Sequence, residues 1–293
     1  MIDYVSIQEL IDKALLTGRK ISALVLEDQA AAGGRSEKEL FDEMAYRLKI
    51  MQEAAGEGAW RTSLSVSGLS GGDAFRLSKA FDNGKTIGGS TIAKVMIKAL
   101  STAEVNAGMG RIVAAPTAGS CGIIPAALLT VMEELVIPEE KIVMGLFTAA
   151  GIGMVIARNA SISGAEGGCQ AECGSASAMA SGALVEIMGG NPGMVGNACA
   201  FALKNVLGLT CDPVAGLVEV PCIKRNASGA VNAIVAANMA LAEIESVIPV
   251  DEVILAMKSI GMLMSSTLKE TSEGGLASTP TGCRLRSKIF GIA

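Results

Sequence analysis

The chain has 293 residues; half are hydrophobic but only 3% are aromatic, the formal net charge is −5, and histidine is absent. This length suffices to bury an aliphatic core, and the charge lacks the basic excess typical of a nucleic-acid-binding protein. Without histidine, the commonest general base and metal ligand is excluded, so any proton transfer must use Lys, Asp, Glu, Cys or a group from a partner chain.

Residues 1 to about 60 form the most charged part of the chain, and helical periodicity is clear there. Apolar residues recur at spacings of three and four, with charges between them, at Phe41, Met44, Leu48 and Met51. This pattern predicts an amphipathic helix over 36–55. The first residues also mix charged with apolar positions and show no cleavable signal pattern, so we expect a cytoplasmic protein.

Two later helices are marked by proline and acidic residues. Pro138 precedes two glutamates, and the apolar run after them ends near Asn159, which predicts a helix over 139–158. Pro249 similarly opens a helix that runs through about Met264.

The middle of the chain, from about 107 to 232, is dense in Gly, Ala and Ser. Small residues allow helices to pack closely, and no long alternating strand pattern is present. We therefore predict an all-α fold: one compact helical domain over 1–293, with its core in about 61–293. Glycine-rich turns are expected at 119–122, 164–168, 189–193 and 228–229.

The mean hydropathy of +0.47 raises the possibility of a membrane protein. The longest uncharged stretch, Ile112 to Met132, reaches spanning length, but it contains two prolines and two glycines. A buried helical core is the favoured interpretation. A helical membrane or scaffold protein remains the non-enzymatic alternative.

Seven cysteines offer the clearest chemical signal, although none forms a CxxC pair of the zinc-ribbon or ferredoxin type. Cys169, Cys211 and Cys222 are flanked by turn residues and charges instead of lying in apolar runs. In a reducing compartment such thiols stay free or bind metal. The remaining cysteines, apart from Cys283, are interpreted as structural or pocket-lining: Cys121, Cys173 and Cys199.

Longer segments around these cysteines carry a family resemblance. GAEGGCQ at 164–170 and GLTCDPVAGLVEVPCIKRN at 208–226 are joined by GRIVAAPTAGSCGIIPAAL at 110–128 and ETSEGGLASTPTG at 270–282. Together they resemble the alpha subunit of iron–sulfur-dependent L-serine dehydratases, over most of the chain.

The resemblance implies a cofactor and an activity. Cys169, Cys211 and Cys222 match the family positions that hold a [4Fe–4S] cluster, whose fourth iron is left open as a Lewis acid for the dehydration of L-serine to pyruvate and ammonia. Cys283 follows the GGLA segment and is a possible fourth ligand. Because ten residues follow it, an exposed tail thiol is the alternative.

Substrate and catalytic groups are less strongly marked. The loop 117–122 precedes an apolar helix, so its amide groups are candidates for binding a carboxylate, with Thr117, Ser120 and Gly122 as candidate residues. Asn226 is a further candidate. Glu166 and Lys224 are the ionisable neighbours of the cysteines that we consider for catalysis, with a surface role as the alternative for each.

The resemblance also implies a partner. The family occurs as one chain or as separate alpha and beta subunits, and the helical part alone is matched here, so we expect a histidine-bearing beta subunit to complete the site. A cluster-dependent lyase acting on L-cysteine or another β-substituted amino acid remains an open alternative. A pyridoxal phosphate enzyme is disfavoured, because no lysine has a convincing Schiff-base and phosphate-loop setting.

Overall fold

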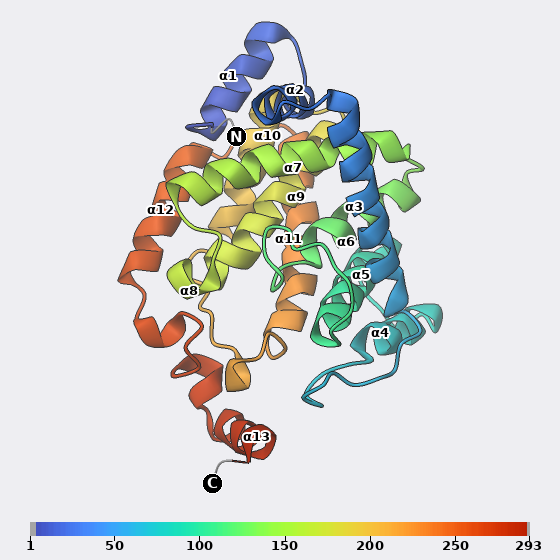
Figure 1. Cartoon of the computed structure of the whole chain (residues 1–293), viewed down its shortest axis with the longest axis vertical. Helices are drawn as coiled ribbons and strands as arrows, with labels where there is room; N and C mark the ends of the chain where they lie inside the picture. Colours follow the sequence, from blue (N-terminus) through green and yellow to red (C-terminus); the bar gives the residue numbers. More distant parts are fainter. Residues whose placement is uncertain (1–3, 292–293) are drawn as a thin grey trace.

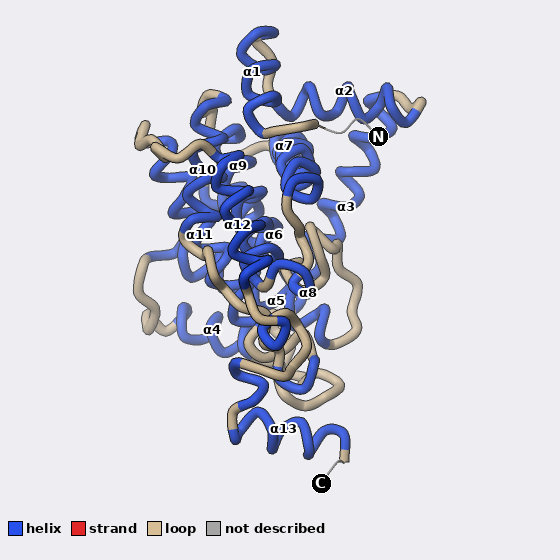
Figure 2. Tube along the Cα trace, turned by 90° about the vertical axis from the view of Figure 1, so that its left-hand side faces the viewer, coloured by secondary structure: helices blue, strands red, loops and turns tan. Residues whose placement is uncertain are grey.

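The computed structural model describes residues 4–291, and within them the chain forms helices joined by loops, with no strand (Figures 1 and 2). The only sheet-like pairing in this part of the chain is an isolated parallel bridge between Cys211 and Lys269. The predicted all-α fold is confirmed.

The helices follow one another along the chain with short connections. Their bounds are α1 Ile7–Thr17, α2 Ile21–Gly33, α3 Glu37–Glu57, α4 Asp73–Asp82, α5 Gly89–Ala107, α6 Ile123–Glu134, α7 Glu139–Asn159, α8 Gly164–Gly167, α9 Ser175–Ile187, α10 Pro192–Lys204, α11 Cys222–Leu241, α12 Val250–Leu263 and α13 Pro280–Phe290. Short 3₁₀ or π turns are η1 Gln170–Gly174, η2 Val214–Gly216, η3 Ser266–Leu268 and η4 Gly275–Ser278.

Helix α9 is the centre of the fold, and each of its side chains is buried. Its sequence, SASAMASGALVEI, is small or apolar on every face, as expected for a helix surrounded by others. Helices α6, α7, α10 and α11 pack around it (Figure 1). Four neighbours can approach one helix because its side chains are short.

Gly182 shows how close this packing is. A methyl group at Gly182 would lie 2.4 Å from Cδ1 of Ile152 on α7 and 3.0 Å from Sγ of Cys199 on α10. Both of those side chains are fully buried. The predicted Gly/Ala-mediated packing is therefore what brings α7, α9 and α10 together.

The boundaries of three helices agree with the sequence patterns, but the turn predicted at 228–229 is wrong, because these residues lie inside α11 and Gly229 packs there against Ile123. Helix α3 begins after Ser36, which forms a capping box with Glu39. Helices α7 and α12 each begin directly after a proline and carry two acidic residues in the first turn. There the negative charges interact favourably with the positive end of the helix dipole. All three predicted helices are confirmed to within about two residues, the usual uncertainty of helix ends.

The long uncharged stretch does not form one helix. Residues 111–122 form a loop with turns, and α6 begins only at Ile123. Among the described residues, one helix, α7, is long and apolar enough to cross a membrane, and 67% of its apolar window is buried inside the protein. That burial is typical of a core helix.

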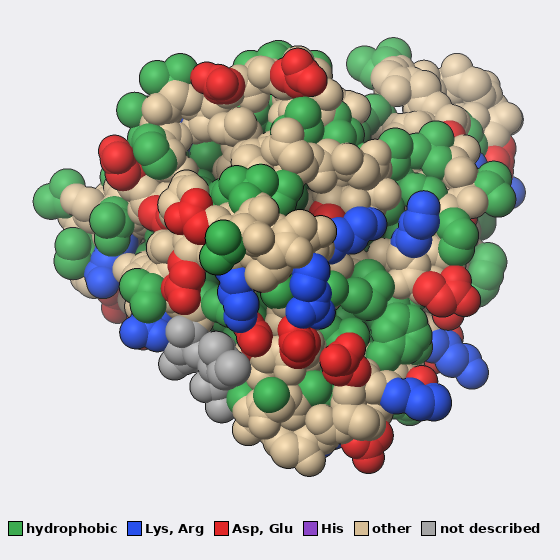
Figure 3. Space-filling view, turned by 90° about the horizontal axis from the view of Figure 1, so that it is seen from above, with side chains coloured by type: hydrophobic (Ala, Val, Ile, Leu, Met, Phe, Trp, Pro, Cys, Tyr) green, Lys and Arg blue, Asp and Glu red, His purple; other side chains and the backbone are tan. Residues whose placement is uncertain are grey.

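Different helices form the two ends of the molecule. Helices α1 and α2 lie at one end and α13 at the other (Figures 1 and 2). Acidic and basic side chains are interspersed with apolar ones on the face seen from the α1 end (Figure 3). The segments around Cys169, Cys211 and Cys222 lie in the half nearer α13, where η2 and η4 pack against that helix (Figure 1).

Candidate active site

Three buried cysteines come from three separate segments of the chain. Cys169 directly precedes the π-helical turn η1, Cys211 lies in the loop between α10 and α11, and Cys222 is the first residue of α11. Their residues are 2%, 2% and 8% exposed, respectively.

The loop that carries Cys211 is fixed by the C-terminal segment. The Cys211 amide donates to the Leu268 carbonyl at 2.8 Å, and the Glu270 amide donates to the Cys211 carbonyl at 2.7 Å. Asp212 accepts a hydrogen bond from the Leu276 amide at 2.8 Å. These bonds bring the ETSEGGLAS segment to the cysteines, although it lies some way along the chain.

The three thiols are close enough to affect one another's ionisation. Burial raises the pKa of Cys211, and the neighbouring Cys169 and Cys222 raise it further. Burial, and next Cys169, raise the pKa of Cys222 to about 12. Each of these thiols makes ionisation of the others less favourable. A bound metal cation would offset this repulsion and stabilise them as thiolates.

Cys173 joins this group. Its sulfur lies 3.3 Å from that of Cys169, one helical turn earlier. Hydrogen bonding with Cys173 lowers the pKa of the Cys169 thiol, and the Arg225 guanidinium adds to this effect against the opposing effect of burial. Cys169 is therefore the member of the pair that ionises first.

Arg225 is the cation of the site. It forms an ion pair with Asp212, Nη2 to Oδ1, at 2.9 Å, and donates to the Thr210 carbonyl at 2.7 Å. Both side chains of the pair are largely buried. Arg225 thus ties the start of α11 to the Cys211 loop and places positive charge near Cys169.

No set of three His, Cys, Asp or Glu side chains within residues 4–291 is arranged to hold a single metal ion. A cubane iron–sulfur cluster makes a different demand, because each cysteine binds a separate iron. Three buried, mutually interacting thiols from three segments are a donor set that fits such a cluster.

The loop 117–122 lies against the start of α11. The Gly122 amide donates to Oδ1 of Asn226 at 2.9 Å, and Nδ2 of Asn226 donates to the Gly119 and Cys222 carbonyls at 2.7 and 3.0 Å. Ser120 is buried, and its hydroxyl lies 3.0 Å from that of Thr117. The structure thus brings the predicted substrate residues next to Cys222, with Asn226 and Gly122 bonded to each other.

The two predicted catalytic candidates lie elsewhere. Glu166 is exposed, and accepts a hydrogen bond from Ser161 at 2.6 Å. Lys224 is exposed and paired with Asp73. The positions of both side chains correspond to the surface alternative stated for them.

Glu172 is the acidic residue that sequence reasoning missed. It is half-buried, accepts a hydrogen bond from the Thr117 hydroxyl, and lies against Gly119. Burial raises its pKa, as does the Glu270 carboxylate, while the bond from Thr117 opposes the shift. The signal that could have found it is its spacing: three residues after Cys169, it shares a helical face with that cysteine.

The other cysteines are separate from this group or buried beside it. Cys199 is fully buried between α9 and α10, and burial raises its pKa to about 12. Cys121 is buried under the loop 117–122. Cys283 is exposed on α13, its sulfur 3.9 Å from the Ala277 carbonyl, and it is not among the groups that shift the pKa values of the three site cysteines.

A loop between α3 and α4 also reaches the site. Glu219, three residues before Cys222, is buried and accepts hydrogen bonds from the hydroxyls of Ser65, Ser67 and Ser70. This anchors residues 63–72 beside the start of α11, which places a glycine- and serine-rich loop next to the cysteines.

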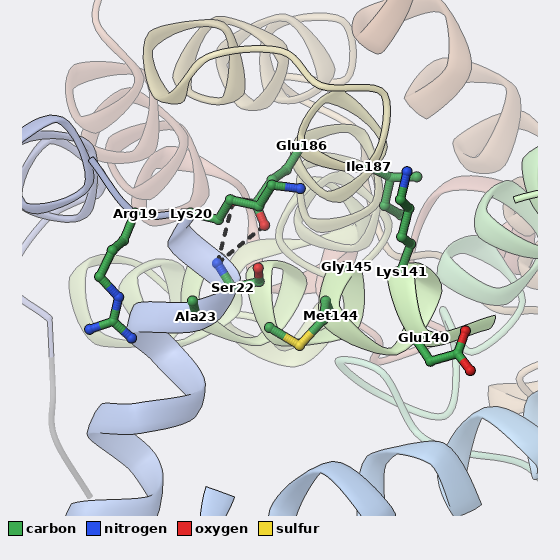
Figure 4. A pocket seen from close by; sticks show the side chains of 10 residues that line it. All are labelled: Arg19, Lys20, Ser22, Ala23, Glu140, Lys141, Met144, Gly145, Glu186 and Ile187. Atoms are coloured by element: carbon green, nitrogen blue, oxygen red, sulfur yellow. Dashed lines mark hydrogen bonds between the residues drawn. The ribbon is translucent and has the colours of Figure 1, made fainter. Parts of the chain in front are cut away.

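A cavity of about 280 Å³ lies apart from the cysteines, between α2, α7 and α9 (Figure 4). At its base, Glu186 accepts hydrogen bonds from the Ser22 amide at 3.2 and 3.3 Å and from the Thr148 hydroxyl at 2.8 Å. Because Lys20 at the start of α2 makes no side-chain cap, Glu186 takes over that task from α9. This cavity serves the helix packing at the α1–α2 end.

Comparison with known proteins places these features in a family. Residues 17–277 match the family model described as "Serine dehydratase alpha chain". The chain is 49% identical over 288 residues to the "Probable L-serine dehydratase, alpha chain" of Bacillus subtilis (strain 168), covering 98% of this chain and 96% of that protein. It is 45% identical over 279 residues to the "L-serine dehydratase, alpha chain" of Peptoniphilus asaccharolyticus, covering 95% and 96%.

A third relative is longer. The "L-serine dehydratase" of Streptomyces coelicolor (strain ATCC BAA-471 / A3(2) / M145) is 40% identical over 277 residues, which are 92% of this chain but only 59% of that protein. The match to the family model covers Cys169, Cys211 and Cys222, the loop 117–122 and the ETSEGGLA segment, and it ends before Cys283. The chain belongs to the serine dehydratase alpha chain family.

Proposed function

We propose that this chain is the catalytic subunit of an L-serine ammonia-lyase, which converts L-serine to pyruvate and ammonia. The observation that carries the proposal is the convergence of Cys169, Cys211 and Cys222 in a chain similar over nearly its whole length to L-serine dehydratase alpha chains. The reaction removes water from the substrate to give 2-aminoacrylate, which tautomerises and is hydrolysed to the products.

The three cysteines are proposed to hold a [4Fe–4S] cluster. Their burial, their origin in three segments and their mutual effect on ionisation fit a donor set with one thiolate for each of three irons. When bound, the cluster supplies an open iron that acts as a Lewis acid on the substrate hydroxyl. Cys283, exposed on α13, is left outside this set.

The chain's own residues are proposed to orient the substrate. Asn226 holds the loop 117–122 against Cys222 through three hydrogen bonds. Among the described residues, no hydrogen bond engages the amide groups of Ala118 and Gly119, which are not buried, so these amides are the proposed partners of the substrate carboxylate. Burial of the cysteines keeps water away from the bond that breaks.

A second subunit is proposed to complete the site. Two relatives that match over nearly their full length carry the designation "alpha chain", and the chain spans only 59% of the Streptomyces coelicolor protein. Removal of the Cα proton needs a positioned base, and this chain has no histidine. A beta subunit that supplies this base and closes the pocket accounts for both facts. We place the assembled enzyme in the cytoplasm.

A lyase acting on L-cysteine is the second candidate, because the same open iron could bind a thiol. The names of the relatives favour serine. The alternative predicts hydrogen sulfide as the product from L-cysteine at a rate above that of pyruvate formation from L-serine.

The test is an anaerobic assay of pyruvate and ammonia formed from L-serine. We expect the purified chain alone to form little pyruvate and the co-expressed pair of subunits to form it rapidly, with L-cysteine a poorer substrate. Full turnover by the chain alone would refute the requirement for a second subunit. Failure of both preparations to form pyruvate would refute the proposed activity.

A further inference from the structure

Two carboxylates and a cysteine converge on Gly164, the first residue of α8. A methyl group placed on Gly164 would lie 2.9 Å from Sγ of Cys211, 3.3 Å from Oε2 of Glu172 and 3.4 Å from Oε2 of Glu270. Glycine at this position therefore leaves two carboxylate oxygens facing one small space beside Cys211.

These carboxylates lack a counter-charge. No ion pair within residues 4–291 includes Glu172 or Glu270, and Arg225, the cation of the site, is committed to Asp212. The hydrogen bond from Thr117 engages Oε1 of Glu172, which leaves Oε2 as the atom nearest Gly164. A half-buried carboxylate facing a second one is costly unless one of them is protonated or a cation lies between them.

We propose that Glu172, supported by Glu270, binds the α-ammonium group of the amino-acid substrate. This inference rests on the proposed function, since it names a substrate-binding residue of the same site. Glu172 lies on the inner side of the space and Glu270, which is exposed, on the open side. An ammonium ion has three donors and no acceptor, so two converging carboxylates suit it.

The position of this subsite orients the rest of the substrate. Cys211 borders the same space, so an amino acid held there by its ammonium lies with its other groups next to the proposed cluster. The loop 117–122 borders it from another side, since Glu172 lies against Gly119. In this arrangement the ammonium group of a small amino acid faces Glu172 and Glu270, and its carboxylate faces the loop 117–122.

The test compares two ligands that cannot react and that differ by the amino group alone: L-alanine and propanoate. Binding of each is measured by calorimetry to the full-length chain, purified anaerobically with any subunit that copurifies. Wild-type protein is expected to bind L-alanine more tightly than propanoate. Glu172→Gln should weaken L-alanine binding at least about tenfold, equivalent to ~1.4 kcal/mol, and leave propanoate binding unchanged.

Matched variants separate charge from structure. Glu172→Asp keeps the charge and should retain part of the preference for L-alanine. Glu166→Gln, which changes an exposed carboxylate on the neighbouring helix α8, should behave as wild type. Iron content equal to wild type in Glu172→Gln would show that Cys169, Cys211 and Cys222 keep their arrangement.

Three outcomes would overturn the inference: Glu172→Gln that keeps the preference for L-alanine, Glu172→Gln that loses both ligands equally, or a wild-type enzyme active on L-serine that binds no L-alanine. Because neither ligand is turned over, the comparison is independent of catalysis. Failure of the proposed function appears separately, as absence of pyruvate from L-serine.

Discussion

Cys169 and Cys173 occupy one turn, and their sulfurs lie 3.3 Å apart. In a cubane cluster each cysteine ligand binds a different iron. Of two sulfurs in hydrogen-bonding contact, we therefore expect one to bind iron and the other to remain a neighbouring free thiol. The pKa of Cys169 is lowered by the hydrogen bond with Cys173 and by Arg225. We therefore propose Cys169 as the ligand and keep Cys173 in the structural or pocket-lining role that its sequence context predicts.

This pair supplies a prediction at the scale of single residues. Cys169→Ala should lose bound iron, because it removes a thiolate that no other residue replaces, whereas Cys173→Ala should keep it. Iron and sulfide content per chain, determined after anaerobic purification, is the measurement. The reverse result would exchange the roles of the two cysteines.

Glu172 is a site residue that local sequence patterns do not identify. Glu166 and Lys224 are candidates in the sequence because they lie near cysteines, with a surface role as the alternative, and the fold places both side chains at the surface. Glu172 becomes distinctive only when Thr117, Gly164 and Glu270 are brought to it. The contacts of Glu172 with Thr117 and Glu270 each span more than 50 residues, one toward each end of the chain, and no local pattern reports them.

At the scale of elements, helix positions were predictable because the signals are local. A capping box before α3 and prolines before α7 and α12 each act within one turn. The pairing of Cys211 with residues 268–270 was not predictable, because it joins two loops through backbone hydrogen bonds that most sequences can make.

Two glycines in helices test the packing with opposite signs. Gly182→Ala puts a methyl group 2.4 Å from the buried Ile152, and overpacking of this kind costs about 1–3 kcal/mol of unfolding free energy. Gly56, in α3, has no atom within 4 Å of an added methyl. Alanine there should stabilise by about 0.5–1 kcal/mol, because glycine lowers helix stability.

Denaturant midpoints followed by circular dichroism measure both changes. The packing of α9 would have to be looser than described if Gly182→Ala were as stable as wild type. Gly56→Ala serves as the control that the substitution of glycine in a helix is not itself harmful.

At the scale of the whole molecule, composition was the most informative property. A chain poor in aromatics and rich in Ala and Gly pointed to close helix packing, and α9 with its four neighbours has that character. The absence of histidine pointed to a catalytic group from outside the chain. This chain matches 59% of the longer Streptomyces coelicolor relative, and the outside catalytic group stays a prediction.

The central claim is that the thiols of this chain form the site at which L-serine loses water. The most direct test is the rate of pyruvate formation from L-serine by the anaerobically purified complex carrying Cys211→Ala, with Cys199→Ala as the matched control. Cys199 is buried between α9 and α10, apart from Cys169, Cys211 and Cys222, so its variant should form pyruvate at close to the wild-type rate. Cys211→Ala should form none above background. A Cys211→Ala complex with the wild-type rate would contradict the account.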